Sequence, residues 1–301
     1  MIDTADGHAV QRLFRLPVSD HVVALRHPTG AEDLLLLEAA RDDTDLALAL
    51  AGHLVRPTDG ARIDWRELTV SDLEALILRL RQAIIGDRVR ADVACQFTAC
   101  GRRIDISFRI SDYLADRKPV TPGVRSAWSV EPDKDPGWFR LIKVRKRPGR
   151  LASSAEPPDH DSNVPFGGDD SASAVAFRLP TIADQLAVVG QRKGADKLAH
   201  RCIRPAGIPL RLRRLVEAAM ETMAPSLSGD LQGTCPECGA KVVVFFDPLQ
   251  FCLRELRDRA AFIYQDIDLL ARRYHWSETD ILAMPHVRRA NYAELARQEA
   301  F

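Results

Sequence analysis

A short cysteine motif decides how this chain folds. Cys235-Pro236-Glu237-Cys238-Gly239 opens a run of strand-forming residues, Lys241 to Phe246. In a zinc knuckle, two thiolates come from such a tight turn, and a glycine after the second cysteine lets backbone N–H groups approach the sulfur. A looser copy, Cys95 to Gly101, has four residues between its cysteines and precedes another predicted strand, Ile104 to Phe108.

One knuckle supplies only two of the four ligands that a closed structural site needs. We therefore expect the two knuckles to share one structural zinc per chain, bound by Cys95, Cys100, Cys235 and Cys238. The longer loop of the first knuckle leaves its metal binding open. A thiol-redox Cys-x-x-Cys is the main alternative, although no thioredoxin-like pattern surrounds it. A site that has lost its metal is another.

Five landmarks recur in the same order in the two halves of the chain, which predicts an internal duplication. They are a Pro-Thr turn, a hydrophobic-Arg-Pro triplet, an amphipathic helix, a Gly-Asp pair and a cysteine pair. The first half has Pro28-Thr29, Val55-Arg56-Pro57, the apolar stripe Leu73, Leu76, Ile77, Leu80 and Ile84, Gly86-Asp87 and Cys95/Cys100. The second half has Pro180-Thr181, Ile203-Arg204-Pro205, the stripe Leu212, Leu215, Val216, Ala219 and Met223, Gly229-Asp230 and Cys235/Cys238. Two unrelated units that each carry a cysteine pair are the alternative.

The predicted fold class is α+β, with duplicated helix-plus-zinc-knuckle β-hairpin units and a long C-terminal helix. Both apolar stripes are typical of core, and Ser71 with Glu74 predicts a capping box at the start of the first. We expect a first repeat with an N-terminal β-hairpin over residues 1–118 and a second repeat over residues 177–247. Residues 119–176 should form a linker that is mostly flexible from 145, where large apolar side chains are rare. Within it, Trp138 to Val144 has the pattern of a strand.

Residues 248–301 form a helical extension without a counterpart in the first half. Asp247-Pro248 supplies an N-cap and a proline at the first helical position. Apolar residues then alternate at spacings of four and three from Leu249 to Tyr274, which predicts one long helix with a coiled-coil-type seam. Ser277 with Asp280 predicts the cap of a short following helix. Apolar residues off the seam predict a partner-binding surface, with packing inside the chain's own domain as the alternative: Phe262, Tyr264, Leu269 and Trp276.

Composition excludes several classes of protein. The chain has 301 residues, with 42 Lys and Arg against 42 Asp and Glu, and only 6% are aromatic. The balanced charge gives no overall attraction to nucleic acid or anionic lipid. The low aromatic content leaves few side chains on which bases could stack. No apolar run has the length of a transmembrane helix and the N-terminus does not resemble a signal peptide, so we expect a cytoplasmic protein. In that compartment Cys202 and Cys252 should be core thiols.

The sequence carries no nucleotide-binding, serine-hydrolase or metalloprotease motif, so we do not expect an enzyme or a small-molecule substrate. Its motifs resemble those of the baseplate hub proteins and baseplate-assembly chaperones of contractile phage tails and related injection particles. The motifs are Leu16-Pro17 to Val22-Val23, Pro28 to Asp33, Ser71-Asp72, Gly86-Asp87, Cys95/Cys100 and the ending Tyr274 to Pro285. The resemblance covers most of residues 12–115 and 177–298.

This resemblance implies a non-enzymatic structural or assembly protein of a contractile-tail baseplate. Its partners would be other baseplate or tail subunits, or a second copy of the chain, and it would be cytoplasmic or incorporated in a tail-like particle. The alternative from another class is a regulatory zinc-ribbon protein that binds nucleic acid. Such ribbons carry basic residues on the exposed hairpin, and the candidates near the knuckles are Arg102, Arg103 and Lys241.

Overall fold

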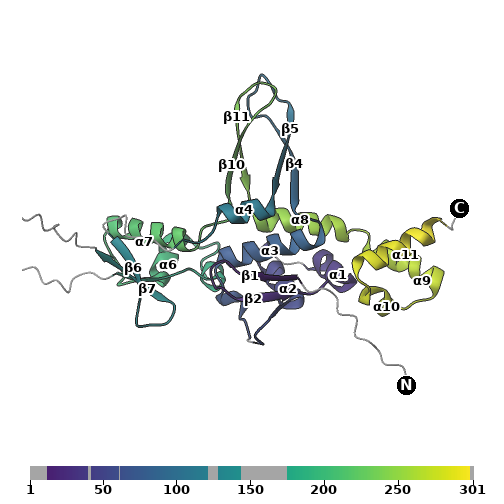
Figure 1. Ribbon diagram of the computed structural model, residues 1–301, viewed down its shortest axis with the longest axis horizontal. Coiled ribbons are helices and arrows are strands. Elements are labelled where there is room, and N and C mark those ends of the chain that lie inside the picture. The colour runs from purple at the N-terminus through teal and green to yellow at the C-terminus, as the bar shows by residue number, and fades with distance from the viewer. Residues whose placement is uncertain (1–11, 40–41, 61, 121–127, 144–174, 299–301) are drawn as a thin grey trace, which may run out of the picture. The chain divides into compact units, whose positions relative to one another are not determined.

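The computed structural model describes residues 12–39, 42–60, 62–120, 128–143 and 175–298. These residues form helices and antiparallel sheets, which confirms the α+β class (Figure 1). The chain divides into two compact units, and both draw on segments from either side of residues 144–174. Unit 1 consists of Met1–Pro119, Thr181–Ala183 and Pro225–Phe301, and unit 2 consists of Val120–Pro180 and Asp184–Ala224.

Unit 1 begins with a three-stranded antiparallel sheet and the helices that follow its strands. The strands lie in the order β1 (Arg12–Arg15), β2 (Val22–Leu25) and β3 (Val55–Pro57). The helices are α1 (Gly30–Glu38), α2 (Asp43–Leu54), the short 3-10 helix η1 (Trp65–Glu67), α3 (Val70–Ile84) and α4 (Ile110–Asp116). Helix α8 (Pro248–Ala260) returns from the other end of the chain and packs against α1, α2 and α3. The core of unit 1 therefore joins segments that lie more than 160 residues apart.

Helix α3 confirms the first apolar stripe, because Leu73, Leu76, Ile77 and Leu80 are all buried. Its predicted capping box is wrong. Thr69 is the N-cap, and its Oγ1 accepts the backbone N–H of Asp72. Ser71 lies inside the helix, where its hydroxyl donates to the carbonyl oxygen of Pro225, and Glu74 instead accepts the backbone N–H of Leu227. Tertiary contacts hold both side chains that the local pattern assigns to the cap.

Two β-hairpins stand side by side in unit 1, with their turns directed away from α3, α4 and α8 (Figure 1). One pairs β4 (Arg88–Ala94) with β5 (Arg103–Arg109), and the other pairs β10 (Gly229–Thr234) with β11 (Lys241–Phe246). At their base, the rings of Phe108 and Phe246 meet edge to face with centroids 5.3 Å apart. Tyr113 of α4 and Phe251 of α8 pack against Phe246, so aromatic contacts fix both hairpins to the helices.

The C-terminal extension of unit 1 contains four helices: α8, α9 (Ile263–Tyr274), α10 (Glu278–Ala283) and α11 (His286–Gln298). Asp247 and Ser277 cap α8 and α10 as predicted. The prediction of one helix from 248 to 274 is wrong, because the chain turns at Ala261 and Phe262 between α8 and α9. Helix α8 packs on α1–α3, whereas α9 packs mainly on α10 and α11. The apolar spacing of four and three would also fit one straight helix. Because the two segments pack against different helices, they form two separate helices instead.

Unit 2 is built on a four-stranded antiparallel sheet in the order β6 (Trp128–Pro132), β7 (Trp138–Lys143), β8 (Val175–Arg178) and β9 (Ile203–Arg204). Helices α6 (Gly194–Cys202) and α7 (Leu210–Met223) accompany it, and α5 (Ile182–Leu186) starts in unit 1 and ends in unit 2. Its core contains Leu141, Phe177, Ile203, Val216 and Ala219, which confirms the second apolar stripe as core.

The compact units follow boundaries different from the predicted domains. Residues 128–143, expected within the linker, form the paired strands β6 and β7. The flexibility expected from residue 145 falls on residues outside the described ranges. The predicted second repeat, 177–247, is divided, because most of it belongs to unit 2 while its hairpin belongs to unit 1.

The elements before and after residues 144–174 nevertheless follow one another in the same order. The first series is β1, β2, α1, α2, β3, α3, β4, β5, and the second is β7, β8, α5, α6, β9, α7, β10, β11. In both, the second strand pairs antiparallel with the third, with an alanine opposite an arginine: Ala24 with Arg56, and Ala176 with Arg204. The internal duplication itself stays a prediction.

Candidate metal centre

The two knuckles close their turns in the same way despite their different lengths. The backbone N–H of Cys95 donates to the carbonyl oxygen of Arg102, and that of Cys235 donates to the carbonyl oxygen of Ala240, both at 2.8 Å. The residues before these acceptors are Gly101 and Gly239, with φ of 54° and 72°. That left-handed conformation favours glycine and turns the chain back into the returning strand. The longer first loop is therefore accommodated without changing how the knuckle closes.

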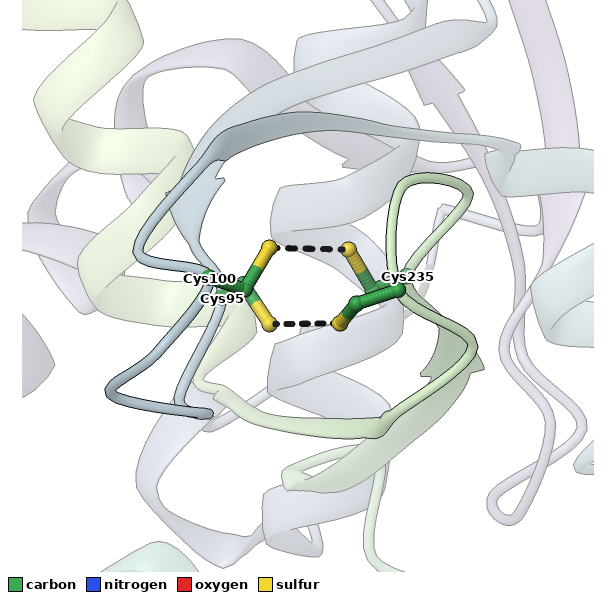
Figure 2. Close-up of side chains that lie close together, drawn as sticks. Cys95, Cys100 and Cys235 are labelled. Atoms are coloured by element: carbon green, nitrogen blue, oxygen red, sulfur yellow. Dashed lines mark hydrogen bonds between the residues drawn. The ribbon is translucent and has the colours of Figure 1, made fainter.

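All four predicted cysteines meet between the tips of the two hairpins. Figure 2 shows their sulfur atoms directed toward one another from opposite turns. The Sγ atoms of Cys95 and Cys238 lie 3.7 Å apart, those of Cys100 and Cys235 lie 4.0 Å apart, and all four lie within 4.8 Å of one another. A tetrahedral zinc with Zn–S bonds of ~2.3 Å requires sulfur–sulfur spacings of ~3.8 Å. The cluster is therefore close to the size of a four-thiolate metal site.

Two close sulfur contacts run between the hairpins. In a redox Cys-x-x-Cys motif, the two cysteines of one motif form the disulfide. Here the 3.7 and 4.0 Å contacts each join one cysteine from either knuckle, and all four are free thiols. This crossed arrangement favours metal binding over a redox pair.

Backbone amides are directed at the sulfurs, as the knuckle motif predicts. Burial alone would raise the pKa of Cys235. The backbone N–H groups of Cys238 and Glu237, together with the thiols of Cys238 and Cys95, outweigh burial and lower the pKa to about 7. The N–H of Ala240 acts on Cys238 in the same sense, but burial and the thiols of Cys100, Cys235 and Cys95 raise the pKa of Cys238 to about 12. Four crowded thiols thus resist ionising together unless a cation compensates for their charge.

Apolar side chains and one interhairpin hydrogen bond support the cluster. Buried Ile104 and Val242, one from each hairpin, pack directly against Cys95 and Cys235. Gln96, in the first knuckle, donates from Nε2 to the carbonyl oxygen of Val243 at 2.6 Å. Side chains that close a site in this way fix the ligands before any metal enters.

Cys202 and Cys252 are fully buried, as predicted for core thiols. Burial raises the pKa of Cys202 to about 11 and that of Cys252 to about 12. Both therefore stay protonated at neutral pH. Neither belongs to the group of four cysteines that could hold a metal.

The four residues predicted to bind a partner divide into two kinds. Phe262 and Tyr264 are 59% and 52% exposed, and the hydroxyl of Tyr264 donates to Glu38 Oε1 at 2.7 Å. Leu269 and Trp276 instead pack against the buried cluster of Leu270, Ile281, Ala293 and Ala296. Trp276 also stacks on Tyr274 with ring centroids 4.7 Å apart. Partner binding stays a prediction, with Phe262 and Tyr264 as its accessible members.

The sequence interpretation missed a set of buried charged residues that connect the elements of unit 1. Arg81, 2% exposed, donates to Glu255 of α8 and to the carbonyl oxygens of Gly86 and Arg88. Arg289 joins α11 to α1 and α9 through Asp33 and Asp266. A signal existed for Arg81, because its spacing from Glu74 and Ile77 places it on the buried face of the helix.

Comparison with known proteins does not add a family: no protein-family model, curated protein or solved structure matches this chain. In the described part of the chain, no helix combines the length and the apolar character needed to cross a membrane.

Proposed function

We propose that Cys95, Cys100, Cys235 and Cys238 bind one structural zinc ion. The supporting observation is that four thiols from two hairpins meet at tetrahedral spacing. Thiolates are soft ligands that suit zinc, and four of them leave no position for a substrate or a catalytic water. The ion would therefore clamp the hairpins together.

Metal analysis of the purified chain tests the zinc. We expect about one zinc per chain, and loss of that zinc in the double variant Cys235→Ser/Cys238→Ser. Cys202→Ala is the matched control, since this buried thiol is not a member of the cluster, and it should keep the metal. Protein purified without chelator that holds no metal, or a double variant that retains a full equivalent, would contradict the proposal.

For the whole chain we propose a non-enzymatic structural or assembly role at the baseplate of a contractile tail or tail-like particle. The proposal rests on the sequence resemblance, and the structure shows what the motif residues do. Thr29 donates from its backbone N–H and hydroxyl to Glu32 at the start of α1. Asp87 fastens the first hairpin to α4, and the cysteines join the two hairpins. These residues maintain a scaffold, which is consistent with a protein that works by binding other subunits.

Affinity purification of the tagged full chain from its native host tests this role. Sheath, tube or spike subunits, or a second copy of the chain, should co-purify with it. The alternative, a nucleic-acid-binding zinc ribbon, predicts bound nucleic acid instead. It is weakened because Arg103, one of its three basic candidates, is paired with Asp92 at 2.6 Å. Recovery of nucleic acid without tail subunits would overturn the proposed role.

A further inference from the structure

A cationic hollow in unit 1 lies away from the metal centre. It has a volume of about 290 Å³ and is lined by residues of α8, α9 and α11 and of the turn between α8 and α9. Its lining includes Arg259, Phe262, Asp266, His286, Arg289 and Arg297. Phe262 is also one of the exposed residues that the sequence predicts to bind a partner.

Arg289 is the most deeply buried cation of this hollow, with 1% of its surface exposed. Its Nη2 donates to Asp33 Oδ2, and its Nε donates to Asp266 Oδ2 at 3.4 Å. Its Nη1 is buried and has no hydrogen-bond partner among the residues that the structure describes. A buried donor without an acceptor is unfavourable, so the guanidinium retains an unmet hydrogen-bonding capacity.

The two carboxylates that contact Arg289 each contact a second basic side chain as well. Asp266 also accepts from Arg297 at 2.8 Å, and Asp33 also lies 3.3 Å from Nδ1 of His286. On the rim, Glu294 lies 3.7 Å from Arg297. The guanidinium of Arg259 is partly buried and forms no ion pair or hydrogen bond with any residue in the described ranges. Burial lowers the pKa of Arg259, and the nearby Asp33 offsets this only in part.

A second hollow of about 150 Å³ shares Arg259 and His286 with the first. The rest of its wall combines an apolar part, made by Leu25, Pro28, Ala83, Ile84, Pro285 and Val287, with the basic side chains Arg12, Arg26 and His27. An occupant of both hollows would thus meet Arg259, which pairs with none of the described residues, next to an apolar wall.

We propose that this pair of hollows binds a carboxylate that carries an apolar carbon chain, with the carboxylate on Arg259. A guanidinium matches a carboxylate in shape and charge, and a charge-assisted hydrogen bond is strongest where water is excluded. The apolar wall favours such a group over inorganic phosphate, which has no apolar part. The C-terminal carboxylate of a partner protein that ends in an apolar residue has this chemistry. The site shares no residue with the metal centre, so it does not depend on the zinc.

Calorimetric titration of the full chain with sodium hexanoate, inorganic phosphate and sodium chloride, all at one ionic strength, tests the proposal. Hexanoate should bind, phosphate more weakly, and chloride not measurably. Arg259→Gln should weaken hexanoate binding by about tenfold or more, the loss of one charge-assisted hydrogen bond. Arg259→Lys, which keeps the charge but not the fork, should bind with intermediate affinity. Arg254→Gln, an exposed arginine on the same helix, is the matched control and should bind as the parent does.

The melting temperature without ligand separates binding from folding. Removing a partly buried cation that has no partner should leave the melting temperature of Arg259→Gln unchanged or raise it. Unfolding of both Arg259 variants would make Arg259 structural and overturn the proposal, as would hexanoate binding that is absent or equal in Arg259→Gln. Phosphate that binds as tightly as hexanoate would overturn the apolar part of the ligand.

Discussion

At the scale of single residues, Asp87 shows how a motif residue holds the scaffold. Its Oδ2 accepts from Arg109 Nε and Ser111 Oγ at 2.8 Å each, and its Oδ1 accepts from Gln82 and from the backbone N–H of Ser111. Burial opposes ionisation, but these donors outweigh it and hold the pKa of Asp87 far below its usual value. The carboxylate thereby joins α3, the first hairpin and α4.

We predict that Asp87→Asn destabilises the protein by about 2 kcal/mol at pH 7, because hydrogen bonds to a charged group are lost. The folded state binds the proton of Asp87 more weakly than the unfolded state does. Its contribution is therefore complete above the unfolded pKa of ~3.9 and is lost as the pH falls from there toward the lower folded pKa. Denaturant unfolding of both proteins between pH 7 and pH 3 should show the difference shrink in acid.

Asp230 provides the matched control for this prediction. It occupies the corresponding position in the second Gly-Asp pair, and its side chain is exposed. Asp230→Asn should change stability by less than about 0.5 kcal/mol. Equal losses for the two variants, or a difference that does not depend on pH, would show that the ionised carboxylate of Asp87 is not the stabilising group.

How far single residues could be predicted depends on whether their partners are local. The cysteines were found because each knuckle closes within a few residues and has a distinctive spacing. The roles of Ser71 and Glu74 were missed because their partners, Pro225 and Leu227, lie about 150 residues away. Local patterns cannot distinguish a cap from a long-range hydrogen bond when the same side chains serve either purpose.

At the scale of elements, a strand-end arginine and a helix-start carboxylate recur in each unit. In unit 1, Arg26 Nη2 lies 2.5 Å from Glu32 Oε1, and Glu32 is 1% exposed. In unit 2, Arg178 Nη1 lies 2.5 Å from Asp184 Oδ2, and Asp184 is 2% exposed. The arginine precedes the acid by six residues in both, so each pair fixes a helix to the strand before it.

We predict that Glu32→Gln and Asp184→Asn each destabilise the protein by about 3 kcal/mol, because each leaves a partly buried arginine without its carboxylate. The exposed pair of Arg272 and Asp268 is the control, and Asp268→Asn should cost less than about 0.5 kcal/mol. Thermal unfolding of the three variants tests this. A Glu32 or Asp184 variant as stable as the control would mean that the pair does not hold its helix.

Element types were easier to predict than element ends. The alternation from Leu249 to Tyr274 indicated helix correctly, yet it could not locate the turn at Ala261 and Phe262. Neither proline nor glycine marks this turn, since what ends α8 is the change from one set of packing partners to another. Periodicity reports which residues face a core, but not whether they face the same one.

At the scale of the whole molecule, the order of the landmarks along the chain did not reveal its division into units. The sequence predicted two consecutive repeats, each supplying half of one shared zinc site. In the structure, the hairpin of the second half lies in unit 1, and strands before and after residues 144–174 share the sheet of unit 2. Which segments of a chain pack together depends on long-range contacts that no local pattern encodes.

Because each unit contains segments from both sides of residues 144–174, we can predict how a chain cut within these residues behaves. Unit 1 needs α8 and β10–β11 from the C-terminal fragment, and unit 2 needs β6–β7 from the N-terminal fragment. We therefore expect a chain cleaved at an inserted protease site to elute from a sizing column as one species. Either fragment expressed alone should be less stable than the whole, because each lacks part of both cores. Chelation of the metal should weaken the association of the cleaved chain without abolishing it, since α8 still packs on α1–α3. Fragments that separate freely in native buffer before any chelator is added would show that these shared cores do not hold the two parts together.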